Sequence, residues 1–149
     1  MSESLRRKME KILEVLDELS EKSVEGTPII VEGINDLKAL RKLNVKGKVI
    51  TAKTRAKSLL DLLEEIDRLR QNEVILLMDF DRRGKEWTRS LTKHLERMKI
   101  KSNLHFWVEL LNLVHKEVKD IEGLPKYIET LKRKAGISYR EVRNPTTLS

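Results

Sequence analysis

Residues Val74–Gly84 read VILLMDFDRRG, an unbroken apolar run followed at once by two aspartates, two arginines and a glycine. Apolar residues without polar alternation are typical of a short strand buried on both faces, as in a parallel sheet covered by helices. Successive strand residues rise about 3.3 Å and alternate in direction, so Asp79 and Asp81 are predicted to point the same way at the strand's carboxyl end. A hard divalent cation with oxygen ligands is a common means of compensating two such carboxylates.

The same Asp-x-Asp pair has a simpler interpretation. Asp79 or Asp81 caps a helix that begins near Gly84, and both carboxylates lie in a solvated loop. Carboxylate pairs also occur in purely structural networks, so the pair alone does not establish a metal site. The choice depends on acidic residues elsewhere in the chain.

The composition fits one domain of ordinary size with a heavily charged surface. The chain has 149 residues, 39% hydrophobic, 37% charged and only 4% aromatic, which favours helices over a β-sandwich. The formal charge of +7 suits a polyanionic partner such as a nucleic acid, and a basic surface also serves solubility. The absence of cysteine excludes disulfides and thiolate metal sites and fits a reducing, cytoplasmic compartment. No signal peptide or membrane span is expected.

Short apolar segments alternate with amphipathic ones along the chain. Strands are predicted at 29–31, 48–51, 74–78 and 118–121. Helices are predicted at 4–20, from Asp36 through Leu43, and at 58–70, 85–98, 103–115 and 124–135. This alternation predicts an α/β fold with a mostly parallel sheet of about four strands and helices on both faces. We divide the chain into an N-terminal amphipathic helix (1–25), the α/β domain (26–136) and a C-terminal tail (137–149).

Acidic residues follow two of the predicted strands. Glu32 and Gly33 end the first strand, Asp36 begins the next helix, and Asp79 and Asp81 end the third strand. Functional groups in open α/β sheets gather at the carboxyl ends of the strands, where the strand order reverses. We therefore expect the order 2-1-3-4, which makes the first and third strands neighbours and brings three carboxylates together.

This pattern resembles the Toprim domain, the catalytic module of DNA topoisomerases, bacterial-type primases, certain small nucleases and a ribosomal-RNA maturation nuclease. The specific parts are the pair Glu32-Gly33 and the segment Asp79-Phe80-Asp81 with Gly84 just after it. The resemblance covers Ile29 to about Leu131 and implies a Rossmann-like Toprim fold. The chain is most similar to the small stand-alone Toprim proteins of archaea and some bacteria.

The resemblance implies roles for individual residues. Glu32 would ligate Mg²⁺ or act as general acid and base at a phosphodiester, and Asp79 and Asp81 would hold one or two Mg²⁺ ions, or Mn²⁺. Such ions stabilise both the attacking and the leaving oxygen in displacement at phosphate. Asp36 is expected to support the site, or simply to favour the helix dipole. The family usually has one more acid on the fourth strand, for which Asp120 and Glu122 are the candidates.

Three basic residues follow the aspartates. Arg82, Arg83 and Lys85 are predicted to bind phosphates beside the metal, and charge balance for the aspartates is the alternative. The three histidines do not share metal-ligand spacing on one helix face and receive no role.

Other families fit the motifs less well. Haloacid-dehalogenase phosphatases place Asp-x-Asp on the first strand with a threonine where this chain has Arg83. Response-regulator receivers need paired acids after the first strand, where only Glu32 stands. Topoisomerase activity needs a nucleophilic tyrosine and a protein gate around the DNA. This chain has only two tyrosines, Tyr127 and Tyr139, and it is too small to form such a gate.

Two hypotheses remain. The first is Mg²⁺-dependent phosphodiester processing of RNA or DNA, in the manner of a nuclease. The second is a nucleic-acid-binding or assembly factor of a larger RNA- or DNA-processing complex. Intact acidic motifs favour the first, and the small size of the chain favours the second. The sequence does not distinguish RNA from DNA or reveal the oligomeric state.

Overall fold

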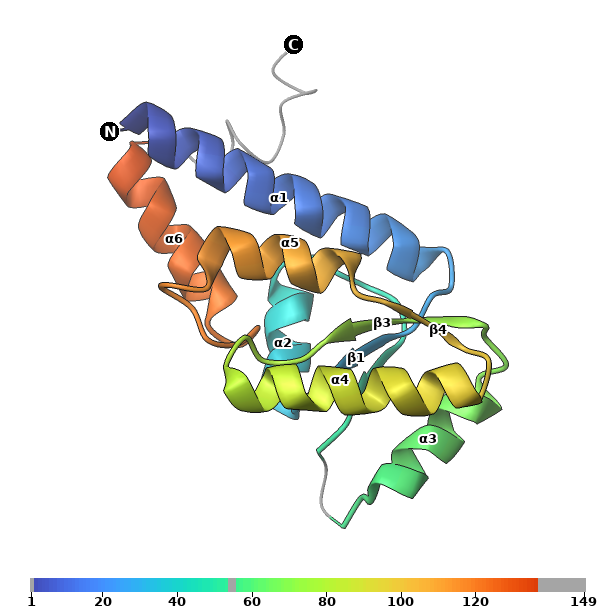
Figure 1. The fold of residues 1–149 in the computed structure, drawn as a ribbon. Coiled ribbons are helices and arrows are strands. Elements are labelled where there is room, and N and C mark those ends of the chain that lie inside the picture. The colour runs from blue at the N-terminus through green and yellow to red at the C-terminus, as the bar shows by residue number, and fades with distance from the viewer. Residues whose placement is uncertain (1, 54–55, 137–149) are drawn as a thin grey trace.

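The computed structural model describes residues 2–53 and 56–136, so the predicted tail at 137–149 lies outside the described residues. The elements in chain order are α1 (Ser2–Val24), β1 (Ile29–Val31), α2 (Ile34–Lys42), β2 (Val49–Thr51), α3 (Leu59–Arg68), β3 (Glu73–Leu77), α4 (Arg82–Arg97), β4 (Lys101–Asn103), α5 (His105–Val114) and α6 (Leu124–Ala135). Strands and helices alternate from β1 to α5 (Figure 1), and the sequence predicts this alternation as far as α4.

The four strands form one parallel sheet in the order β2-β1-β3-β4. This is the predicted order 2-1-3-4. Ile30 of β1 pairs with Ile50 on one side and with Leu76 on the other. The carboxyl ends of β1 and β3 therefore lie side by side, and the residues that follow these two strands meet at one edge of the sheet.

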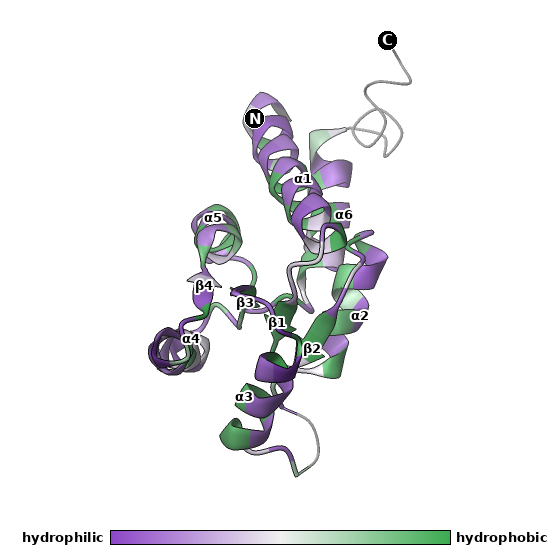
Figure 2. Ribbon diagram, turned by 90° about the vertical axis from the view of Figure 1, so that its right-hand side faces the viewer, coloured by the Kyte–Doolittle hydropathy of each residue, from purple (hydrophilic) through white to green (hydrophobic). Residues whose placement is uncertain are grey.

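The central strand β3 is buried on both faces, as its continuous apolar sequence predicts. Ile75 and Leu77 pack into the core formed with α1, α2, α5 and α6. Val74 and Leu76 pack into a second core formed with α3 and α4. Figure 2 shows the sheet between these two helical layers.

The N-terminal helix is part of the main core. Met9, Ile12 and Leu19 are fully buried at helical spacing on one side of α1. This side packs against α5 and α6, which lie beside α1 in Figure 1. Burial of several large aliphatic side chains stabilises α1 through tertiary contacts, as expected of a helix whose propensity alone is marginal.

The predicted fourth strand at 118–121 is wrong, and the fourth strand is β4 instead. Its three residues are Lys101, Ser102 and Asn103, and none of them is apolar. An edge strand is paired on one side only, so it needs no apolar run. Val118 and Ile121 are buried in the helical core within the connection between α5 and α6, and this burial explains their apolar character.

A backbone hydrogen bond positions the connection between α5 and α6. The backbone N–H of Phe80 donates to the carbonyl of Lys119 at 2.7 Å, which holds the connection against the end of β3.

Gly136 adopts a left-handed conformation (φ 67°) and ends α6, as predicted. In the described part of the chain, no helix has the length and apolarity to cross a membrane.

Candidate functional site

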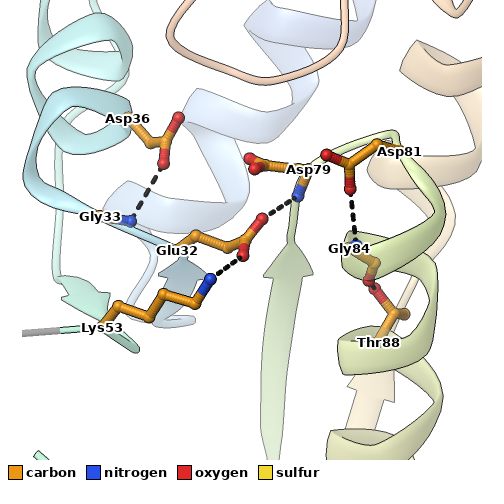
Figure 3. Close-up of polar contacts among 8 residues, drawn as sticks. All are labelled: Glu32, Gly33, Asp36, Lys53, Asp79, Asp81, Gly84 and Thr88. Atoms are coloured by element: carbon orange, nitrogen blue, oxygen red, sulfur yellow. Dashed lines mark hydrogen bonds and ion pairs between the residues drawn. The ribbon is translucent and has the colours of Figure 1, made fainter.

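Glu32 and Asp79 meet at the carboxyl edge of the sheet, because they follow the neighbouring strands β1 and β3 (Figure 3). The backbone N–H of Asp79 donates to Glu32 Oε2 at 3.0 Å. The residue Glu32 is only 5% exposed. The structure thus brings together two of the three predicted catalytic carboxylates.

Lys53 is a site residue that the sequence interpretation missed. It follows β2, and its Nζ lies 3.1 Å from Glu32 Oε1. The same ammonium lies 5.8 Å from the centre of the Trp87 ring, within the range of a cation–π interaction. The sequence feature that could have identified Lys53 is its position just after the second strand, because all the parallel strands end at the same edge of the sheet.

Asp36 is buried at the start of α2 and binds two backbone N–H groups. Its Oδ2 accepts from Gly33 at 3.0 Å, which caps the helix, and its Oδ1 accepts from Glu122 at 2.9 Å. The second bond joins the site to the connection between α5 and α6. Asp36 therefore fixes the position of that connection, in addition to serving as an acid in the first turn of α2.

Asp81 caps α4. Its Oδ1 accepts from the backbone N–H of Gly84 at 2.8 Å. The predicted capping role thus occupies one of the two carboxylate oxygens of Asp81. Asp81 is exposed and does not line the pocket that contains Glu32 and Asp79.

Gly84 allows α4 to begin directly against Asp79. A Cβ on residue 84 would lie 2.0 Å from the Asp79 carbonyl oxygen. No larger residue fits there without a shift of the backbone. The glycine is therefore explained by this close approach, which brings the first turn of α4 to the site.

Both candidates for a fourth acid lie near the site, but neither follows a strand. Glu122 lines the pocket, which has a volume of about 360 Å³ and is also lined by Glu32, Asp36, Lys53 and Asp79. Asp120 Oδ1 accepts from Gly123 at 2.8 Å, and its charge acts on Asp79. The connection between α5 and α6 supplies the acids that were expected from a strand.

The predicted phosphate-binding residues lie along α4, outside this pocket. Arg82 forms a surface ion pair of 3.4 Å with Glu86. Arg83 is exposed, and Lys85 lines a separate groove between α4 and α5.

The two carboxyl groups at the centre of the pocket have shifted pKa values. Burial raises the pKa of Asp79 from 3.8 to about 8, with hydrogen bonding and repulsion from Glu32 and the charges of Asp36 and Asp120 adding to the shift. Burial also acts to raise the pKa of Glu32, but hydrogen bonds from Asp79 and the Lys53 ammonium outweigh it and lower that pKa. The two carboxyl groups therefore titrate as a coupled pair, in which the pKa of Asp79 is raised and that of Glu32 is lowered.

The acidic side chains of this pocket, Glu32 and Asp79 above all, offer the carboxylate oxygens that would hold a magnesium ion. Within residues 2–53 and 56–136, no group of three or more His, Asp or Glu side chains is arranged to hold a metal ion. Mg²⁺ often binds through only one or two carboxylates, so a group of three protein ligands is not required. Burial and the neighbouring acids raise the pKa of Asp79, and a divalent cation beside this carboxyl group would favour its ionised form.

Comparisons with known sequences agree with these features. The sequence profile of the Toprim domain matches residues 27–111, which include all four strands, Glu32 and Asp79. A UPF0292 protein of Methanosarcina acetivorans is 38% identical over 142 residues, which cover 95% of this chain and 96% of that protein. A UPF0292 protein of Methanocaldococcus jannaschii is 40% identical over 120 residues, which cover 80% of this chain and 91% of that protein.

A solved structure shares the architecture. A protein from Aquifex aeolicus is similar with a TM-score of 0.60 and 28% sequence identity, over 73% of this chain and 94% of that one.

Proposed function

This chain belongs to the Toprim domain family, which is associated with metal-dependent nucleic-acid processing, and we propose that it cleaves phosphodiester bonds in RNA or DNA with Mg²⁺ or Mn²⁺. The observation that carries the proposal is the meeting of Glu32 and Asp79 in an acidic pocket of a chain whose formal charge is +7. A polyanionic substrate suits the overall charge, and the local acids suit a cation that would bridge enzyme and phosphate. A nucleic-acid substrate also favours the cytoplasmic location expected from the sequence.

The side chains that line the pocket, together with Asp81 outside it, have separate proposed roles. Asp79 and the second oxygen of Asp81 would hold the metal, which when bound neutralises charge on the reacting phosphate. Glu32 is ionised at neutral pH and would orient an attacking water by accepting its proton. Lys53 lies beside Glu32 and would contact a phosphate oxygen. Asp36 acts through the backbone bonds that hold α2 and the α5–α6 connection.

A second candidate function is a non-catalytic nucleic-acid-binding or assembly factor of a larger processing complex. The engagement of the carboxylates favours it: both oxygens of Glu32 are paired, with Asp79 N–H and with Lys53, and one oxygen of Asp81 caps α4. In this case, the acidic pocket would hold the strand ends together without performing a reaction.

The deciding experiment incubates the protein with end-labelled single- and double-stranded RNA and DNA, in Mg²⁺, in Mn²⁺ and in chelator. The proposal expects metal-dependent cleavage that Asp79→Asn abolishes. Asp67→Asn is the matched control, because Asp67 is an exposed acid at the end of α3, away from the pocket.

Each outcome has a clear meaning. Cleavage retained in Asp67→Asn and lost in Asp79→Asn supports the phosphodiesterase. Metal-independent binding without any cleavage, equal in wild type and Asp79→Asn, contradicts it and supports the assembly factor.

A further inference from the structure

A groove of about 600 Å³ runs between α4 and α5, beside the short edge strand β4. Figure 2 shows these two helices on either side of β4. The strand pairs only with residues 73–75 of β3, so the two helices flank the rest of that edge. The groove is separate from the acidic pocket and shares no lining residue with it.

One wall of the groove is basic. Lys85, Arg89 and Lys93 of α4 line it at intervals of four residues, which places them about 6 Å apart along the helix axis. All three side chains are exposed, and none forms an ion pair with another described residue. The wall therefore carries three cations with a regular spacing and one acid, Glu96, at its far end, which leaves an excess of positive charge.

The other wall is apolar. Leu104, Trp107 and Leu111 of α5 line it, and the indole N–H of Trp107 donates to the Met78 carbonyl at 2.9 Å, which fixes the ring. Val108 adjoins them on the same helix and is 42% exposed.

The floor also has little polar character. The hydroxyls of Thr88 and Thr92, which line the groove, donate to carbonyls of their own helix at 2.8 Å. Because these hydroxyls donate within α4, they offer a ligand only acceptor oxygens, and the cations of the basic wall supply the donors.

We propose that this groove binds a single-stranded segment of nucleic acid, with phosphates along the α4 cations and bases over the apolar wall of α5. The proposal rests on the proposed function and extends its site. A row of like charges complements the repeated charge of a polynucleotide backbone, and unpaired bases offer apolar faces that a duplex hides. The basic wall starts at Lys85, one turn from the Asp81 cap of α4, so the strand would lead to the acidic pocket.

The test measures binding of a fluorescein-labelled single-stranded oligonucleotide in chelator, so that the metal site does not contribute. Arg89→Gln with Lys93→Gln is expected to weaken binding by roughly tenfold or more. The dependence of log Kd on log salt should become shallower by about 1.4, the value for two lost phosphate contacts to a single strand. Val108→Ser, at an exposed position, should weaken binding without changing the salt dependence.

The matched control is Lys38→Gln with Lys42→Gln. These are exposed cations at the same spacing of four residues on α2, in the other helical layer (Figure 2). Equal weakening in the α4 and α2 variants would overturn the groove and indicate a general effect of charge. Unchanged binding in the α4 variant would also overturn it, and so would tighter binding of an acidic amphipathic peptide in competition with the oligonucleotide.

The groove proposal and the proposed cleavage activity can be contradicted independently of each other. Weaker binding in the α4 variant, with no cleavage by the wild type, supports the groove and removes the phosphodiesterase. Metal-dependent cleavage by the wild type, with unchanged binding in the α4 variant, does the reverse.

Discussion

The backbone N–H of Asp79 donates to the side chain of Glu32 across a sequence separation of 47 residues. This bond joins the ends of the two central strands and makes the conformation of one acidic residue depend on the carboxylate of the other. The pocket is therefore a coupled unit, and its acids should respond together to pH, to metal and to substitution.

The first prediction concerns pH. Because folding raises the pKa of Asp79 from 3.8 to about 8, the folded protein binds this proton more tightly than the unfolded chain does. Stability should thus fall as pH rises from about 5 to about 8 in metal-free protein. Burial shifts Asp36 in the same direction, whereas the lowered pKa of Glu32 acts with opposite sign only below its ordinary value of 4.5.

The measurement is the melting temperature across this pH range in chelator. The wild type should lose several degrees, and Asp79→Asn should lose much less. Saturating Mg²⁺ should reduce the loss, because a ligand that binds only the folded state stabilises it. A wild-type melting temperature that rises over this range would contradict the coupled pocket.

The second prediction concerns Gly84. Gly84→Ala should lower the free energy of unfolding by about 3 kcal/mol or more, because its Cβ would lie 2.0 Å from the Asp79 carbonyl oxygen. Gly33→Ala is the matched control, since its nearest contact would be an ordinary 3.9 Å and its φ of −142° suits any residue. The control should cost about 1 kcal/mol or less in a denaturant titration. Equal losses would show that α4 does not depend on the close approach.

The third prediction concerns Asp36. Asp36→Ala removes acceptors from two backbone N–H groups and should destabilise the fold by about 2 kcal/mol. Hydrogen exchange gives the specific readout. The Glu122 amide should exchange faster in the variant through local opening, whereas the exchange rates of amides in β3 should change only as much as the global stability changes. An unchanged Glu122 amide would mean that other contacts hold the α5–α6 connection.

The fourth prediction concerns Lys53. Lys53→Gln removes the ammonium beside Glu32, so Mn²⁺ should bind roughly fivefold more tightly through reduced repulsion. Cleavage should nevertheless become slower if Lys53 contacts a phosphate oxygen. Titration calorimetry and the cleavage assay measure these opposite changes, with Lys38→Gln as the control for charge. Weaker Mn²⁺ binding in Lys53→Gln would show that the lysine supports the metal site instead.

The sequence alone predicted the elements whose burial requires a clear apolar pattern. The apolar run before Asp79 identified β3, and the acids after two strands identified the strand order. The position of β4 was not predictable in this way, because Lys101–Asn103 is a polar edge, whereas Val118 and Ile121 owe their apolar character to helix packing. Lys53 was missed because a lysine after a strand has no distinctive pattern, and only the pairing of the strands shows that it lies beside Glu32.

The composition of β4 has a consequence for self-association. An unpaired strand edge can recruit a strand from another copy, and a long apolar edge does so readily. Here the sheet ends on one side in Lys-Ser-Asn, with Lys101 exposed, and on the other side in a strand of only three residues, Val49–Thr51. Both borders offer few backbone groups to an incoming chain, so growth of the sheet from molecule to molecule is disfavoured. The strand that was hardest to recognise in the sequence thus helps to keep the protein from aggregating.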